Sequence, residues 1–137
     1  MQRSCPEVFY QRALALRLFA RGFQVREEVR FGVKRFDTIA YDGAKIYGFE
    51  VKLRVSKRSI RQAAIYQVAC DYVYLVVPEA SSPNDAMRER CHELGIGIIT
   101  LGDPPYWAIR TILTARLSKA KSSRSAESIL SYAEFGV

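Results

Sequence analysis

The chain has 137 residues with a formal net charge of +7. Hydrophobic residues make up 49% and charged residues 26%, which is typical of a single globular domain and excludes a disordered chain. No apolar run reaches the ~18 residues that a membrane helix needs, so we expect no membrane partner and a cytoplasmic location. The basic charge favours anionic partners, of which nucleic acid is the commonest.

The first part of the chain is expected to fold as one helix followed by three strands. Residues 4–21 show helical spacing of apolar residues, and Ser4 with Glu7 has the pattern of a capping box. Residues 23–31 alternate as a strand, with Phe23 and Val25 inward. Two further strands, residues 35–41 and 45–53, flank the turn signal Asp42-Gly43. The sequence therefore predicts a helix packed beside a strand meander.

The next part alternates between helices and strands. Residues 56–70 and 81–95 are expected to be helices, the first beginning near Ser56 or Ser59 and the second ending at Gly95. Residues 71–78 and 96–101 are short, continuously apolar strands, as expected where helices cover both faces of a sheet. Alternating strands and helices after a hairpin predict an α/β fold with a partly parallel sheet.

The last part of the chain is expected to contain two helices joined by a polar link. Residues 106–120 are read as a helix, residues 121–128 as a polar link, and residues 127–135 as a short closing helix. We therefore expect a core domain over residues 1–103 and a helical extension over residues 104–137. That extension either packs on the core or forms the seam of a homodimer.

Three charged residues interrupt the predicted hairpin, namely Asp37, Glu50 and Lys52. If residues 42–45 form its loop, counting outwards places Asp37 opposite Glu50, and any even-numbered loop keeps all three on one face. Two carboxylates ~5 Å apart repel by about 3 kcal/mol at an effective dielectric constant near 20. A divalent cation between them would reverse that sign. The competing interpretation is an exposed strand face of mixed charge.

These residues resemble the D…ExK signature of the PD-(D/E)xK nuclease superfamily: Asp37, a twelve-residue spacer, then Glu50-Val51-Lys52. Gln62 and Tyr66 resemble the QxxxY motif of its RecB-type branch, and the layout is also similar to archaeal Holliday junction resolvases. The resemblance covers about residues 7–101. It implies a restriction-endonuclease-like αβββαβ(αβ) core, a central mixed sheet flanked by helices. Phe36 stands where the motif has proline, and the serine or threonine that resolvases carry before the aspartate has no counterpart.

The resemblance also implies roles for the candidate site residues. Asp37 and Glu50, with the Val51 carbonyl, would ligate Mg²⁺ or Mn²⁺, and Glu7 would be an outer ligand. Lys52 would position or deprotonate the attacking water. Gln62 and Tyr66 would orient the scissile strand or that water.

A run of cations follows the predicted site. Between Val51 and Cys70 there is no acidic residue, and the same stretch is rich in lysine and arginine. We expect this run and Arg35 to grip the phosphates of duplex or branched DNA. The expected phosphate-binding residues are Arg35, Arg54, Lys57, Arg58 and Arg61.

The resulting hypothesis is a metal-dependent deoxyribonuclease, an endonuclease of structure-directed or restriction type. Two alternatives stay open: a RecB-like exonuclease, and a non-catalytic nucleic-acid-binding module. A structural zinc site is not expected, since the three cysteines show no paired spacing and there is a single histidine. The cysteines are instead expected to be buried free thiols.

Overall fold

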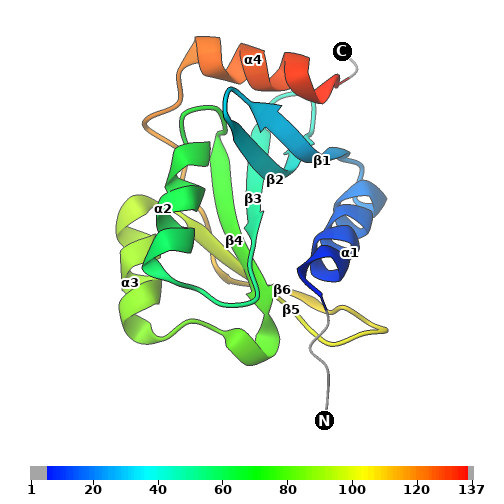
Figure 1. The fold of residues 1–137 in the computed structure, drawn as a ribbon, viewed down its shortest axis with the longest axis vertical. Coiled ribbons are helices and arrows are strands. Elements are labelled where there is room, and N and C mark those ends of the chain that lie inside the picture. The colour runs from blue at the N-terminus through cyan, green and yellow to red at the C-terminus, as the bar shows by residue number, and fades with distance from the viewer. Residues whose placement is uncertain (1–5, 136–137) are drawn as a thin grey trace.

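The protein is a layered assembly of helices around one sheet, seen in a computed structural model that describes residues 6–135 (Figure 1). In chain order the elements are α1 (Glu7–Ala20), β1 (Gln24–Phe31), β2 (Lys34–Tyr41), β3 (Ile46–Val51), α2 (Lys57–Tyr66), β4 (Tyr72–Pro78), the 3₁₀ turn η1 (Glu79–Ser81), α3 (Asp85–Leu94), β5 (Gly97–Leu101), β6 (Ile109–Leu113) and α4 (Ser123–Ala133). The predicted helix–meander–helix–strand–helix–strand order is therefore present.

One mixed sheet contains all of these strands, in the spatial order β1-β2-β3-β4-β5-β6. β1, β2 and β3 pair antiparallel as a meander. β3, β4 and β5 pair parallel, because α2 and α3 carry the chain back across the sheet between them. The α/β fold class predicted from the sequence is confirmed.

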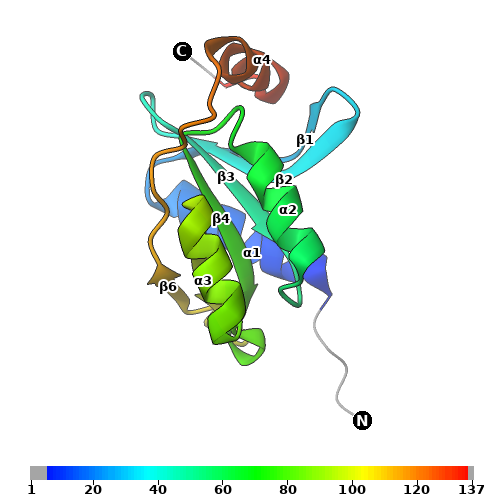
Figure 2. The same cartoon turned by 90° about the vertical axis from the view of Figure 1, so that its left-hand side faces the viewer.

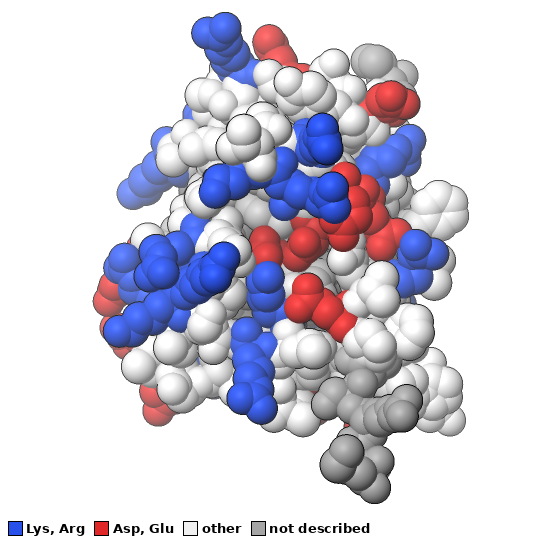
Figure 3. All heavy atoms as spheres, viewed as in Figure 1, with Lys and Arg blue, Asp and Glu red and all other residues white. Residues whose placement is uncertain are grey.

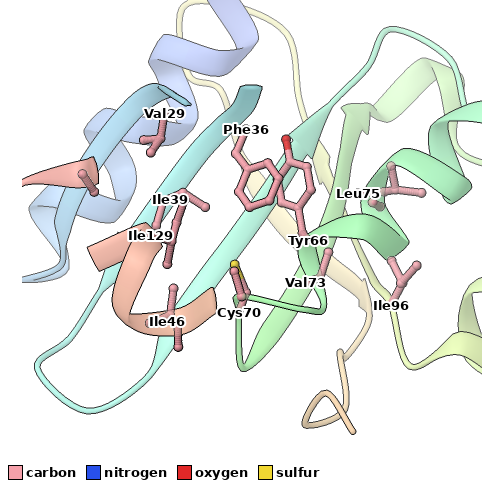
Figure 4. Packing of buried hydrophobic residues seen from close by; sticks show 14 of the residues in the cluster. Val29, Phe36, Ile39, Ile46, Tyr66, Cys70, Val73, Leu75, Ile96 and Ile129 are labelled. Atoms are coloured by element: carbon pink, nitrogen blue, oxygen red, sulfur yellow. The ribbon is translucent and has the colours of Figure 1, made fainter. Parts of the chain in front are cut away.

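Helices cover both faces of this sheet (Figure 2). On one face, Tyr10, Leu14 and Leu18 of α1 pack against the strands. On the other face, residues of α2, α3 and α4 join a second and larger core cluster, part of which is drawn in Figure 4. Because β4 and β5 lie between these two layers, Val73, Leu75, Val76, Val77 and Ile98 are fully buried. This explains the continuous apolar runs of those strands.

The helix ends follow capping chemistry, with one difference from the expectation. Ser56 and Ser59 form a capping box at the start of α2, and Gly95, with φ of 78°, ends α3. α1 begins at Glu7 with Pro6 as its N-cap residue, so Glu7 is the first helical residue rather than the third. Ser4, the expected cap, lies outside the described residues.

The prediction of a helix over residues 106–120 is wrong. The chain forms β6 there instead, and β6 pairs antiparallel with β5. The sequence Ile-Arg-Thr-Ile-Leu-Thr is rich in β-branched residues, which favour a strand, and Trp107 adopts a φ of 48° that interrupts any helix. The segment after residue 103 is therefore not purely helical, and its strand belongs to the same sheet as the rest.

The closing helix α4 is present and packs on the core, but it begins at Ser123, so most of the stretch expected to be a polar link is helical. Ala126, Ile129 and Ala133 are buried, and Phe135 stacks on Tyr41 with ring centroids 5.6 Å apart. Lys121 just before it forms a 2.6 Å ion pair with the buried Asp71, whose other carboxylate oxygen accepts a hydrogen bond from the Ile46 amide. The C-terminal segment is thereby tied to the starts of β3 and β4.

The cysteines and the helices bear on two expectations drawn from the composition. Cys70 and Cys91 are free and buried, as predicted, whereas Cys5 lies outside the described residues. Among residues 6–135, none of the helices combines the length and the apolar character needed to cross a membrane.

Candidate active site

The β2–β3 hairpin has the register that the sequence predicted. Tyr41 pairs with Ile46, and the ladder continues to the pair Thr38–Phe49. The next position in the same register would place Asp37 opposite Glu50. The regular ladder ends one step before it, so the two carboxylates lie where β2 and β3 begin to separate.

A third carboxylate, that of Glu28, lies in the same row. Glu27 pairs with Thr38 and Val29 with Phe36, which places Glu28 opposite Asp37 with no regular bridge between them. Glu28 has a φ of 55°, an unusual conformation for a residue other than glycine. Backbone strain of this kind clusters at functional sites. The strand pairing is thus interrupted on both sides of Asp37.

Side chains take over the hydrogen bonds that the strands do not make at Asp37. Its amide donates to the Tyr66 hydroxyl at 2.7 Å, and its carbonyl accepts from Gln11 Nε2 at 2.8 Å. Its carboxylate oxygen Oδ2 accepts from the Val51 amide at 2.9 Å. Asp37 is therefore held in one orientation by three different elements, α1, β3 and α2.

The environment of Asp37 disfavours its negative charge. Burial, followed by the nearby charge of Glu50, raises the pKa of Asp37 to about 7, against the lowering effects of the Val51 amide and Lys52. Glu50 is only 5% exposed. Lys52 Nζ lies 3.4 Å from Glu50 Oε1 and is partly open to solvent. One ammonium group therefore partly compensates two closely spaced carboxyl groups.

The cavity in front of these residues has a volume of about 260 Å³. It brings together residues from the β1–β2 turn, β2, β3 and α2. Its lining consists of Val33, Lys34, Arg35, Phe36, Asp37, Glu50, Lys52, Gln62, Ile65 and Tyr66. Five predicted functional residues, Asp37, Glu50, Lys52, Gln62 and Tyr66, thus share one cavity, and Arg35 joins them.

Tyr66 lines the cavity beside the carboxylates. Its ring stacks on Phe36, as Figure 4 shows, with ring centroids 4.0 Å apart, and its hydroxyl lies near Asp37 and Glu50. Burial, then the charges of Asp37 and Glu50, raise the pKa of Tyr66 far above its ordinary value. The hydroxyl therefore stays protonated and can donate to Glu50 while it accepts from the Asp37 amide.

Gly48 provides the space for that tyrosine. A Cβ atom at Gly48 would lie 2.6 Å from Tyr66 Cδ2 and 2.9 Å from Cys70 Sγ. The space that the missing side chain leaves beside Glu50 is thus filled by the tyrosine ring.

Glu7 is not part of the cavity lining, and no contact between it and Asp37 or Glu50 is seen. It lies on the first turn of α1, half-buried, with Gln11 one turn further along the same helix. Gln11 is the α1 residue that reaches the site: it is 5% exposed and its amide also donates to Glu28 Oε1 at 3.1 Å.

Sequence reasoning did not identify Gln11 or Glu28. A signal for Gln11 was present, since it is a polar residue among Tyr10, Ala13 and Leu14 on the apolar side of α1. Glu28 could have been found by treating Gly32-Val33 as a two-residue turn, which pairs Glu28 with Asp37 by counting.

Cationic side chains flank the acidic centre. Figure 3 shows acidic groups gathered in the middle of this face, with lysine and arginine on either side of them. Arg54, Lys57, Arg58 and Arg61 are all exposed, from the end of β3 through the first turns of α2. Arg35 is also exposed and lies 3.7 Å from Glu28. The two carboxyl groups of the cavity therefore lie among cationic side chains, some in the cavity lining and others on the exposed surface around it.

The donor atoms at the site suit a hard divalent cation. Asp37 and Glu50 offer carboxylate oxygens, and the Val51 amide already points to Asp37. Because the N–H and C=O of a strand residue face the same neighbour, the Val51 carbonyl is expected on that side too. Within residues 6–135, no three His, Cys, Asp or Glu side chains cluster tightly enough to enclose a metal alone. Two carboxylates completed by water and a carbonyl are the pattern typical of Mg²⁺.

Comparisons with known proteins inform the fold only. No family model matches the sequence, and no curated protein matches it. Among solved structures, the crystal structure of a protein of unknown function, AF1548, is similar with a TM-score of 0.51 and 10% sequence identity. The match covers 66% of this chain and 56% of AF1548, so this chain corresponds to little more than half of that protein. At this identity the likeness supports the α/β architecture.

Proposed function

We propose that this protein is a Mg²⁺- or Mn²⁺-dependent deoxyribonuclease of the PD-(D/E)xK superfamily. The observation that carries the proposal is the meeting of Asp37 and Glu50 in one cavity beside Lys52, where the pKa of Asp37 is raised to about 7. Such an arrangement weakens the fold unless a cation compensates it, and strongly perturbed carboxyl groups in a cavity mark functional sites.

The residues of the site would have different roles in phosphodiester hydrolysis. Asp37, Glu50 and the Val51 carbonyl would hold the cation, which when bound stabilises charge on phosphoryl oxygens and lowers the pKa of water. The Tyr66 hydroxyl, which lies near Glu50, would orient that carboxylate or the attacking water, and Gln62 lines the same cavity. The Lys52 ammonium, 3.4 Å from Glu50 Oε1, would position the attacking water or stabilise negative charge that develops as the phosphorus–oxygen bond breaks.

The cationic side chains around the cavity supply the binding surface for the substrate. Arg54, Lys57, Arg58 and Arg61 would neutralise backbone phosphates without reading the base sequence. Cations in the first turn of a helix oppose its dipole, and Lys57 and Arg58 are the first residues of α2. Bound phosphate would relieve that conflict, since the N-terminal end of a helix favours anions.

Within this activity we propose an endonuclease, structure-directed or restriction-like, acting as a homodimer where both strands are cut. A cytoplasmic location remains a prediction. Cleavage of covalently closed circular DNA distinguishes this form from a RecB-like exonuclease, because a closed circle offers no end.

The proposal is tested by incubating the protein with closed circular, linear duplex, branched and single-stranded DNA in Mg²⁺, Mn²⁺ or EDTA. We expect cleavage only with a divalent cation, and a loss of about 100-fold or more in Glu50→Gln and in Lys52→Ala. Lys45→Ala, which removes an exposed lysine from the β2–β3 loop, is the matched control and should retain activity.

Two results would contradict the proposal. Metal-dependent cleavage that survives in both Glu50→Gln and Lys52→Ala would refute the assigned site. Tight DNA binding without cleavage under every metal would instead support a non-catalytic binding module.

A further inference from the structure

The turn between β1 and β2 exposes an apolar residue that the fold does not require. Gly32 and Val33 form a two-residue loop, in which Gly32 has a φ of 62° and Val33 does not have a positive φ. This pattern is typical of a type II′ turn, for which glycine at the first position is the main requirement. Val33 is 99% exposed, and valine is not among the residues that favour turns. Neither burial nor turn chemistry explains it.

The cations around this turn repel one another, which lowers the stability of the fold. Arg30 lies directly opposite Arg35 in the β1–β2 ladder, and Phe31 opposite Lys34. Like charges at paired positions destabilise a hairpin. The pair is only partly offset, because Glu28 lies 3.7 Å from Arg35 and both side chains are largely exposed. An anion between the arginines, such as a backbone phosphate, would relieve the repulsion.

The turn has a fixed position relative to the candidate active site. Phe31 stacks on Phe36 with centroids 5.3 Å apart, and Phe36 stacks on Tyr66 with centroids 4.0 Å apart, so aromatic rings connect the base of the turn to the tyrosine that binds the Asp37 amide. Val33, Lys34 and Arg35 line the same cavity as Asp37 and Glu50. In Figure 2 the loop projects outwards beside α2, clear of the helices. A ligand lying in this cavity would therefore meet the turn.

We propose that this turn is a wedge that probes base stacking next to the cleavage site, so that the substrate is DNA with interrupted stacking. Val33 inserts between neighbouring bases, while Arg30, Lys34 and Arg35 hold the adjacent phosphates. Apolar side chains inserted in this way must unstack a base step, which is least costly at a mismatch, nick or junction. The inference rests on the proposed nuclease function and adds a substrate class and the element that selects it.

A membrane surface is the other partner that a basic turn with an apolar tip could enter. DNA is favoured because the turn shares its cavity with the carboxylates and Lys52, and because the exposed cations of α2 continue the basic surface. A single turn also offers one apolar side chain, whereas stable membrane attachment requires a larger apolar area.

The test uses the full chain carrying Glu50→Gln, so that bound DNA is not cut. Two DNA probes are compared: a duplex with 2-aminopurine beside a mismatch, and a fully paired duplex with 2-aminopurine at the same position. Binding is measured by fluorescence anisotropy and unstacking by 2-aminopurine emission. We expect emission to rise severalfold on the mismatched duplex, with binding about tenfold tighter than to the perfect duplex. With Val33→Ser added, the emission increase and the preference should both largely disappear. Leu117→Ser, which changes an exposed apolar residue outside this cavity, is the matched control and should alter neither.

The outcomes separate this inference from the function on which it rests. If the Val33→Ser protein gives the same emission increase and preference, the wedge is refuted while the nuclease proposal stands. If the protein with intact Glu50 cleaves none of the DNA forms and the Glu50→Gln protein binds none of them, both fail together. If Val33 is instead required for binding to vesicles of anionic lipid and has no effect on DNA, the turn is a membrane contact and the wedge is refuted.

Discussion

Asp37 is the residue on which the proposed metal site depends most. Three hydrogen bonds hold its backbone and carboxylate, yet burial and Glu50 work against its charge. The structure therefore fixes the position of a group whose ionised form it does not stabilise. A bound cation is the simplest way to reconcile these two facts.

The raised pKa predicts an unusual pH dependence of stability. Because the pKa of Asp37 rises from 3.8 in the unfolded chain to about 7 in the folded one, its contribution to stability is complete below pH 3.8 and is lost as the pH rises through about 7. Asp37→Asn should therefore stabilise the metal-free protein at pH 8 by roughly 2–4 kcal/mol, and the gain should vanish near pH 4. Urea unfolding in EDTA across this pH range measures it.

Asp42→Asn is the matched control for that prediction. Backbone hydrogen bonds from Lys45 and Ala44 lower the pKa of Asp42, so its stabilising effect is present above pH 3.8 and lost as the pH falls. The control should therefore be less stable than wild type at pH 8. A destabilised Asp37→Asn protein under the same conditions would show that the carboxylate is favourable without metal.

At the scale of the elements, the site forms where the meander loses its regular pairing. The pairing of β2 with β3 followed from counting residues around the loop, because a hairpin with a buried face fixes its register. Asp37, Glu50 and Lys52 were therefore predictable together. The distortion at Glu28 was not, since a positive φ at a glutamate has no local signal in the sequence.

The same contrast explains which elements elsewhere in the chain were predicted wrongly or missed. β4 and β5 were predicted because buried strands have continuous apolar runs, but β6 is half-exposed and its pattern also fits a helix. Its pairing with β5 decided between the two. Gln11 reaches Asp37 through the packing of α1 on the sheet, which depends on tertiary structure rather than on local spacing.

Packing between β3 and α2 gives a prediction at this scale. Gly48→Ala should force Tyr66 away from Glu50, lower the stability by about 1–3 kcal/mol and reduce cleavage. Gly102→Ala is the control, because its added Cβ would meet its nearest neighbour at 3.4 Å, an ordinary contact. Thermal unfolding and cleavage rates are compared for both. If Gly48→Ala matched Gly102→Ala in both measurements, the close packing of β3 on Tyr66 would have no functional importance.

At the scale of the whole molecule, the distribution of charge over the surface matters more for binding a polyanion than the net charge of +7. Acidic groups gather in the middle of one face, with lysine and arginine on either side of them (Figure 3). Such a surface would attract a polyanion at long range while its centre requires a cation before a phosphate can approach closely. Substrate binding and metal binding should therefore reinforce each other.

The cationic side chains around the cavity predict a strong dependence of DNA binding on salt. Plots of log affinity against log salt concentration should be linear, and Lys57→Ala and Arg58→Ala should each reduce the slope by about 1. Arg124→Ala, an exposed arginine on α4, should leave the slope unchanged. Equal effects of all three substitutions would indicate non-specific attraction by net charge.

The measurement that tests the central claim most directly is calorimetric titration of the protein with Mn²⁺. We expect saturable binding to wild type, with little or none to Asp37→Asn and to Glu50→Gln, while Asp42→Asn binds as wild type does. Thermal unfolding should show the same pattern, because a cation that binds only the folded state raises the melting temperature. If wild type bound no Mn²⁺, or if Asp37→Asn bound it equally well, the carboxylate pair would not be a metal site and the proposed nuclease mechanism would be refuted.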